Sequence, residues 1–238
     1  MMHQQPTLRF LGATGGGMDM TFLPAGHILG AAPVHVRTGP CSVHFAGDLG
    51  RTDDPPMNPP RPLEGTDFMV TESTHGNRLC SSVDPEQQLG DIVRRVAKRG
   101  GVVLFAAFAV GRAETLMLHL SPLRGKNLIL DIPVVPSGYQ AGGTRDAALA
   151  GGARELRIYG EDVTIRAEVV QMESLSAHAD ADGILAWLKN APREPRMTYI
   201  THGEPDASDA LRLRIKRELG GRTRVPEHLE KISLEDPR

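Results

Sequence analysis

Residues 45–50 (FAGDLG) place Asp48 between two glycines, directly after an apolar stretch. Glycines beside a polar residue let the backbone turn sharply and leave room for a ligand. Residues 25–30 (AGHILG) and 199–204 (YITHGE) have a similar design around His27 and His202. Imidazole and carboxylate groups at strand ends are common ligands of zinc and manganese. Taken by itself, each segment is more often a structural turn than a ligand-binding loop.

Two further segments bring polar side chains to the ends of apolar elements. Residues 70–76 (VTESTHG) place the carboxylate of Glu72 at the end of a predicted strand. Residues 174–180 (SLSAHAD) place His178 just before a predicted helix, which Asp180 is suited to cap. Five segments therefore carry potential chemistry in the order His27, Asp48, Glu72, His178 and His202.

Predicted strands and helices alternate around these segments. Apolar runs bounded by turn residues predict strands at residues 8–13, 33–37, 42–46, 68–71, 102–105, 128–135, 156–159, 163–170 and 197–201. Helical spacing of apolar residues and capping signals predict helices that begin at residues 84–86, 112, 180 and 206. Strands alternating with helices indicate an α/β fold built from packed layers.

The composition excludes several classes of protein. No apolar run is long enough to span a bilayer, residues 1–10 lack a signal-peptide pattern, and the two cysteines form no motif, so we expect a cytoplasmic protein. The net charge of −2 means that any RNA contact must come from a local basic cluster. Arg212, Arg214, Lys216 and Arg217 form one such cluster, which a solvated helix face also explains.

The order of the segments carries more information than any one of them. GHILGAA, FAGDLGR, TESTHG, FAVGRAETL, SAHAD and THGE follow one another as they do in the β-CASP branch of the metallo-β-lactamase superfamily, which the chain resembles. The resemblance implies a truncated metallo-β-lactamase-type αββα sandwich with a reduced β-CASP cap. It places the incomplete metallo-β-lactamase domain in residues 1–75 and 161–238, and the shortened cap in residues 76–160.

The same resemblance implies a role for each of five residues. His27 and His202 match metal-binding histidines, and Asp48 matches the aspartate that bridges two metal ions. Glu72 matches the acidic residue of β-CASP motif A, and His178 matches the motif B histidine at the scissile phosphate. The implied metal ligands are thus His27, Asp48 and His202, and the implied catalytic residues are Asp48, Glu72 and His178.

One departure from the family pattern affects the expected metal content and activity. The principal metal motif, His-x-His-x-Asp-His, is absent, and His75 stands where the family usually has tyrosine. Asp19, His44 and His75 are candidates for replacement ligands. The family holds two zinc ions, whereas we expect one or none here.

The resemblance predicts a metal-dependent hydrolase of the RNA-processing ribonuclease type, which cleaves RNA phosphodiester bonds. The absent motif keeps open a catalytically impaired remnant or a non-catalytic family member that binds RNA or a protein partner. A hydrolase of a smaller substrate is a third class, because a fold alone does not determine function. RNA, a homodimer and a protein complex are the expected partners.

Overall fold

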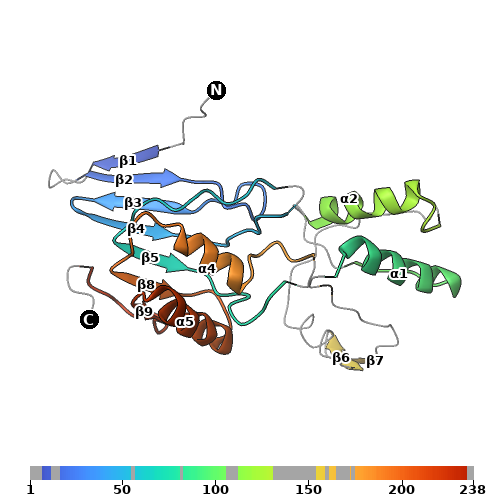
Figure 1. Cartoon of the computed structure of the whole chain (residues 1–238). Helices are drawn as coiled ribbons and strands as arrows, with labels where there is room; N and C mark the ends of the chain where they lie inside the picture. Colours follow the sequence, from blue (N-terminus) through green and yellow to red (C-terminus); the bar gives the residue numbers. More distant parts are fainter. Residues whose placement is uncertain are drawn as a thin grey trace. The chain divides into compact units, whose positions relative to one another are not determined.

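The computed structural model describes residues 7–11, 17–54, 57–80, 83–105, 112–130, 154–158, 161–164, 172 and 175–234. The chain divides into two compact units, which are Met1–Cys80 with Ala177–Arg238, and Ser81–Ser176 (Figure 1). Both units contain helices and strands, which agrees with the expected α/β class. The assignment of a metallo-β-lactamase domain and a cap to particular residues stays a prediction, since compactness alone does not identify a domain.

The first unit contains a seven-stranded sheet in the order β1-β2-β3-β4-β5-β8-β9 (Figure 1). Its strands are β1 (Thr7–Leu11), β2 (Gly17–Phe22), β3 (Val34–Thr38), β4 (Cys41–Phe45), β5 (Phe68–Thr71), β8 (Met197–Ile200) and β9 (Thr223–Arg224). Neighbours are antiparallel from β1 to β4 and parallel from β4 to β9. Because β4, β5 and β8 run in the same direction, the loops that follow them leave the sheet at one edge, which we call the C-terminal edge.

Helices α4 (Ala181–Lys189) and α5 (Pro205–Leu219) cover one face of this sheet (Figure 1). Asp180 caps α4 by accepting a hydrogen bond from the backbone N–H of Gly183 at 2.8 Å, as its sequence position predicts. The main core lies between the helices and the sheet. It combines residues of the strands and loops with residues of both helices, among them Met69, Ile200, Ile184, Leu188 and Leu211.

A smaller core lies on the opposite face of the same strands. Phe68 directly precedes Met69 but belongs to the second cluster, with Val43, Met197 and Tyr199. Successive strand residues point to opposite faces, and the parallel strands are buried on both faces, which is typical of parallel sheets. Ile232 and Leu234, near the C-terminal end of the described chain, pack against this second cluster.

The described residues of the second unit form two packed helices and an antiparallel pair of strands. Helices α1 (Pro85–Lys98) and α2 (Arg112–Gly125) bury a common apolar cluster that includes Leu89, Val93 and Leu120. Asp84 caps α1 by accepting the N–H of Glu86 at 2.9 Å, which confirms the predicted helix start. Strands β6 (Glu155–Ile158) and β7 (Glu161–Thr164) pair antiparallel.

Some predicted strands in the second unit are wrong. Residues 102–105 form no strand, and the side chains of Val102 and Leu104 are 91% and 82% exposed. Strand propensity leads to a strand only where a neighbouring strand supplies hydrogen bonds and packing. Residues 128–130 are also irregular, whereas the remainder of that predicted strand, 131–135, lies outside the described residues, as do residues 165–170 of another. No helix in the described part of the chain combines the length and apolar character needed to cross a membrane.

Candidate metal centre

Five polar side chains of the first unit meet at the C-terminal edge of its sheet. Asp48, Glu72 and His202 follow the parallel strands β4, β5 and β8, respectively. His27 lies in the loop after β2, and His178 lies just before α4. We call these five residues the Asp48 site. The structure thus brings together all five residues that the sequence singled out, although 175 positions separate the first from the last.

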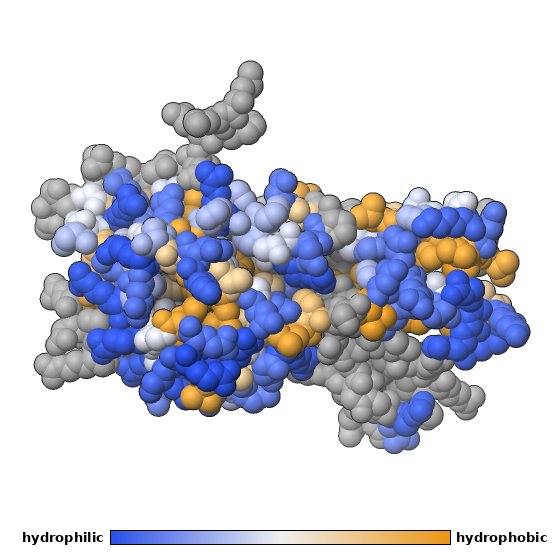
Figure 2. Space-filling model, viewed as in Figure 1, coloured by the Kyte–Doolittle hydropathy of each residue, from blue (hydrophilic) through white to orange (hydrophobic). Residues whose placement is uncertain are grey.

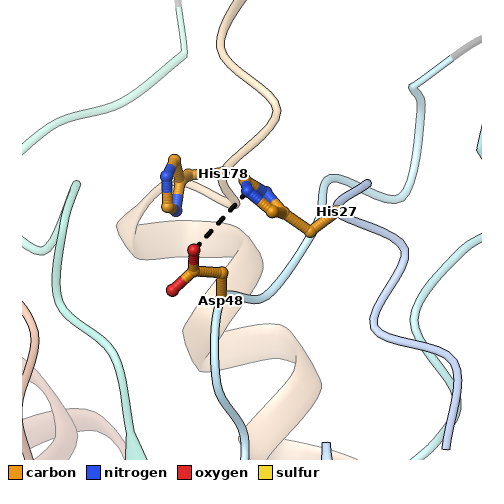
Figure 3. Close-up of side chains that lie close together, drawn as sticks. All are labelled: His27, Asp48 and His178. Atoms are coloured by element: carbon orange, nitrogen blue, oxygen red, sulfur yellow. Dashed lines mark ion pairs between the residues drawn. The ribbon is translucent and has the colours of Figure 1, made fainter. Parts of the chain in front are cut away.

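Asp48 occupies the middle of the site because its two oxygens face different histidines. Oδ2 lies 3.6 Å from Nε2 of His27, and Oδ1 lies 3.2 Å from Nδ1 of His202. Two overlapping groups of potential ligand atoms, each within 4.8 Å of one another, are His27, Asp48 and His178, and Asp48, Glu72 and His202. Figure 3 shows the imidazoles of His27 and His178 beside the Asp48 carboxylate. A carboxylate shared by two donor groups has the arrangement of a bridging ligand.

Glu72 orients His178 through a hydrogen bond to its buried carboxylate. Nδ1 of His178 lies 3.0 Å from Oε2 and 3.2 Å from Oε1 of Glu72, whose side chain is 1% exposed. Burial raises the pKa of Glu72, but hydrogen bonds from His178, Thr74 and the N–H of Leu49 outweigh it, so the net pKa is lowered. The ionised carboxylate accepts Nδ1–H and leaves Nε2 as the ring nitrogen that addresses a ligand.

His27 is suited to bind a metal because its surroundings favour the neutral imidazole. Burial lowers the pKa of His27, and the nearby His178, with ring centroids 4.3 Å apart, lowers it further. Neutral imidazole is the form that ligates metal ions. Imidazole nitrogens and carboxylate oxygens are zinc ligands, and the atoms close enough to share an ion are those of His27, Asp48 and His178, or of Asp48, Glu72 and His202.

Close approach of two backbone segments explains why residue 50, two positions after Asp48, is a glycine. A Cβ on Gly50 would lie 1.9 Å from the carbonyl oxygen of Gly26 and 2.5 Å from the nitrogen of His27. The N–H of Gly50 donates to the carbonyl of Ala25 at 2.9 Å, which locks the two loops together. Any larger residue at position 50 would separate the loops that carry His27 and Asp48.

His202 has an unusual backbone conformation at the same edge. Its φ of 51° lies in the left-handed region, which costs a non-glycine residue about 1 kcal/mol or more. The hydroxyl of Thr74 donates to the carbonyl of His202 at 3.2 Å and lies 3.3 Å from its Nδ1. Disfavoured conformations of this kind concentrate at functional sites.

The three candidate replacement ligands lie in different surroundings. His75 contacts the site, with its ring centroid 5.8 Å from that of His178. His44 is fully buried beside Trp187 of α4, and Asp19 pairs in register with Arg37 in the sheet. None of the three belongs to a potential ligand group among the described residues. The position of His75 three residues after Glu72 is the sequence signal that places it here.

The basic cluster on α5 has acidic neighbours. Arg212 pairs with Asp209, Arg214 pairs with Asp182 and Glu218, and Arg217 also pairs with Glu218. Figure 2 shows a mostly hydrophilic surface over this helix. These pairs favour the interpretation of a solvated helix face over that of an RNA-binding patch.

Comparison with known proteins agrees with the interpretation of the Asp48 site as a metal centre. The profile of the Zn-dependent metallo-hydrolase RNA specificity domain matches residues 162–226, which include His178 and His202. The chain is 36% identical over 131 residues to the transcription termination factor FttA of Methanosarcina mazei. This alignment covers 51% of this chain and 20% of that protein. The chain is also 35% identical over 119 residues to the endoribonuclease ysh-1 of Neurospora crassa, in an alignment that covers 48% of this chain and 14% of that protein. These similarities support the resemblance of the chain to the β-CASP metallo-β-lactamase family.

A third similarity extends over more of the chain. The RNase J-like protein of Methanocaldococcus jannaschii is 22% identical over 291 residues, covering 86% of this chain and 68% of that protein. The alignment is longer than the 238 residues of this chain, so the relative contains internal residues that this chain lacks. The chain spans a fifth or less of the length of FttA and of ysh-1.

Proposed function

We propose that this chain is a metal-dependent hydrolase of the RNA-processing ribonuclease type, which cleaves phosphodiester bonds in RNA. The observation that carries the proposal is the Asp48 carboxylate, whose two oxygens face His27 and His202 while His178 lies alongside. The named relatives include an endoribonuclease and an RNase J-like protein, which supports RNA as the substrate class. The proposed architecture is an incomplete metallo-β-lactamase domain, residues 1–75 and 161–238, with a shortened cap, residues 76–160.

The proposed metal ligands are His27, Asp48 and His202. Zinc held by these residues would supply Lewis-acid polarisation of the phosphodiester. Asp48 would neutralise positive charge from a position shared by both histidines. These ligands give an ion only two protein donors at a time, either His27 with Asp48 or His202 with Asp48. We therefore propose weak binding of at most one zinc ion per chain, because firm zinc sites generally have three or more protein ligands.

His178 and Glu72 are proposed to supply the proton that the leaving oxygen needs. Glu72 accepts Nδ1–H and holds the ring in place. Nε2 of protonated His178 then donates its proton to the ribose oxygen that leaves when the P–O bond breaks, while water supplies the new oxygen on phosphorus and releases a proton to solvent. Glu72 is buried, which shields its carboxylate from solvent.

A second candidate function is a catalytically impaired family member that binds RNA or a protein partner. The absence of His-x-His-x-Asp-His from the sequence favours this candidate. The alignment with the RNase J-like protein also favours it, because that protein has internal residues that this chain lacks. A second copy of the chain or a separate protein is then the proposed partner, and the Asp48 site would bind rather than cleave.

Zinc content and RNA cleavage together test the proposal. Elemental analysis after dialysis should find at most one zinc ion per chain, and a 5′-labelled single-stranded RNA should be cleaved slowly. Asp48→Asn should weaken zinc binding by more than about 100-fold and abolish cleavage, because loss of a ligand exceeds the 10–100-fold effect of outer partners. Asp209→Asn, an exposed aspartate on α5, is the matched control and should change neither.

The other outcomes separate the alternatives. Two firmly held zinc ions would refute the proposed stoichiometry and show that further residues complete the site. Zinc and RNA binding without cleavage would favour the impaired family member. Cleavage of bis(p-nitrophenyl) phosphate but not of RNA would identify a hydrolase of smaller substrates.

A further inference from the structure

His75 extends the Asp48 site beyond the five residues described above. Its ring lies 5.8 Å from that of His178, tilted by 46°. The ring of His178 also contacts those of His27 at 4.3 Å and His202 at 6.3 Å, measured between centroids. His178 is therefore surrounded by imidazoles from the loops after β2, β5 and β8.

The loop that carries His75 is tightly packed. The N–H of Gly76 donates to the carbonyl of Ser73 at 3.0 Å, which closes a turn around position 75. A Cβ on Gly76 would lie 2.4 Å from the carbonyl oxygen of Ala207 and 2.9 Å from Cβ of Leu211, so the turn rests directly on α5. Such packing holds a side chain in a defined place, as a binding site requires.

Further contacts connect this loop to the rest of the site. The Ser73 hydroxyl donates to the carbonyl of Thr201 at 2.9 Å and lies 2.8 Å from the Ser208 hydroxyl. Glu72 of the same loop holds His178, and Thr74 contacts His202. One rigid segment thus positions His75 relative to both histidines.

The surroundings of His75 favour contact with substrate over metal ligation. His75 belongs to neither potential ligand group in the described part of the chain. It is partly exposed and lies beside the histidine proposed to donate a proton to the leaving oxygen. An imidazole N–H is a good donor to an anionic oxygen, and such charge-assisted hydrogen bonds are the strong ones.

We propose that His75 is a substrate-binding residue, whose imidazole donates a hydrogen bond to a non-bridging oxygen of the phosphodiester that lies at His178. This inference rests on the proposed function. It assigns His75 to RNA affinity and leaves zinc binding to His27, Asp48 and His202.

Binding of a fluorescein-labelled single-stranded oligoribonucleotide to the zinc-loaded full chain tests the inference. Fluorescence anisotropy at 4 °C, read before products form, gives Kd, and elemental analysis gives zinc content for each variant. His75→Ala should raise Kd about tenfold, the effect of losing one hydrogen bond to a charged group. His75→Gln keeps an N–H donor and should stay within about threefold of the wild type. His228→Ala, which replaces an exposed histidine, should leave Kd unchanged.

Each contrary result points to a different error. An unchanged Kd in His75→Ala, with normal RNA binding by the wild type, would overturn the role of His75 and leave the proposed function intact. Loss of zinc from His75→Ala or His75→Gln would show that His75 belongs to the metal site. A wild type that binds neither zinc nor RNA would overturn the proposed function, and this inference with it. Far-ultraviolet circular dichroism identifies a variant that fails to fold, in which case the Gln variant decides.

Discussion

Two groups of histidines in the first unit differ in the partners that the fold provides. His27, His178 and His202 lie at the C-terminal edge of the sheet beside the carboxylates of Asp48 and Glu72. His35 and His44 lie opposite each other on β3 and β4, with ring centroids 5.7 Å apart, and both are buried, with His44 beside Trp187 of α4. Neither ring nitrogen of His44 has a hydrogen-bond partner among the described residues.

The difference shows how one residue type acquires two kinds of behaviour. At the edge, carboxylates orient the rings and leave nitrogens directed toward a ligand. In the interior, burial and the neighbouring His35 lower the pKa of His44 to about 4, so the ring is neutral at physiological pH. His44 therefore behaves as a core residue, although its sequence position made it a candidate ligand.

Removing His178 should produce the largest change and would separate catalysis from metal binding at the edge. His178→Ala should slow RNA cleavage by about 10²–10⁴-fold, the usual contribution of a general acid. Zinc content should stay near the wild-type value, because the proposed ligands are other residues. Parallel cleavage assays and elemental analysis check this, with His228→Ala as the control. Loss of zinc together with activity would show that His178 is a ligand.

Replacing His44 should affect stability and leave zinc content unchanged. The pKa of His44 is about 4 in the folded protein and 6.5 in a model compound, so the unfolded chain takes up the proton first as the pH falls. The wild type should lose about 3 kcal/mol of stability from this group as the pH falls from 6.5 to below 4. His44→Leu should lack this loss and also relieve two unsatisfied buried nitrogens.

Urea unfolding at several pH values measures the effect of His44. The stability difference between His44→Leu and the wild type should grow as the pH falls through this range, whereas His228→Leu should follow the wild type. A constant difference would show that His44 does not titrate as its burial indicates. Reduced zinc binding by His44→Leu would contradict the separation of the two histidine groups.

The Glu72–His178 pair offers a smaller test at the edge. Glu72→Gln keeps the shape of the side chain but removes the charge, so His178 should be held less firmly. Cleavage should fall by about 10–100-fold, the usual effect of losing a partner that orients a site residue. Glu64→Gln, on a partly exposed glutamate, is the control. Undiminished cleavage by Glu72→Gln would show that its charge is not needed to orient His178.

Local sequence signals predicted many elements but missed those that depend on distant neighbours. Asp84 and Asp180 cap helices as their positions predict, because capping needs only the next few residues. Strand β2 was not predicted, since Gly17 and Asp19 are poor strand formers and its pairing with β1 and β3 comes from outside the segment. Residues 102–105 show the reverse, with strand propensity but no strand.

The sequence by itself determined the residue types, their order and the glycines that let the loops meet. It identified His27, Asp48, Glu72, His178 and His202 as a set, because six segments occur in a family-specific order. It could not decide among His75, His44 and Asp19, which are all polar residues within or just after a strand.

Only the tertiary structure decided which of these residues share a site. The parallel register of β4, β5 and β8 brings Asp48, Glu72 and His202 to one edge, and the paired strands β5 and β8 are more than 100 residues apart in the chain. It also places His75 beside His178 and turns His44 into the core under Trp187. Hydrogen bonds between distant strands determine these positions, and no local pattern in the chain encodes them.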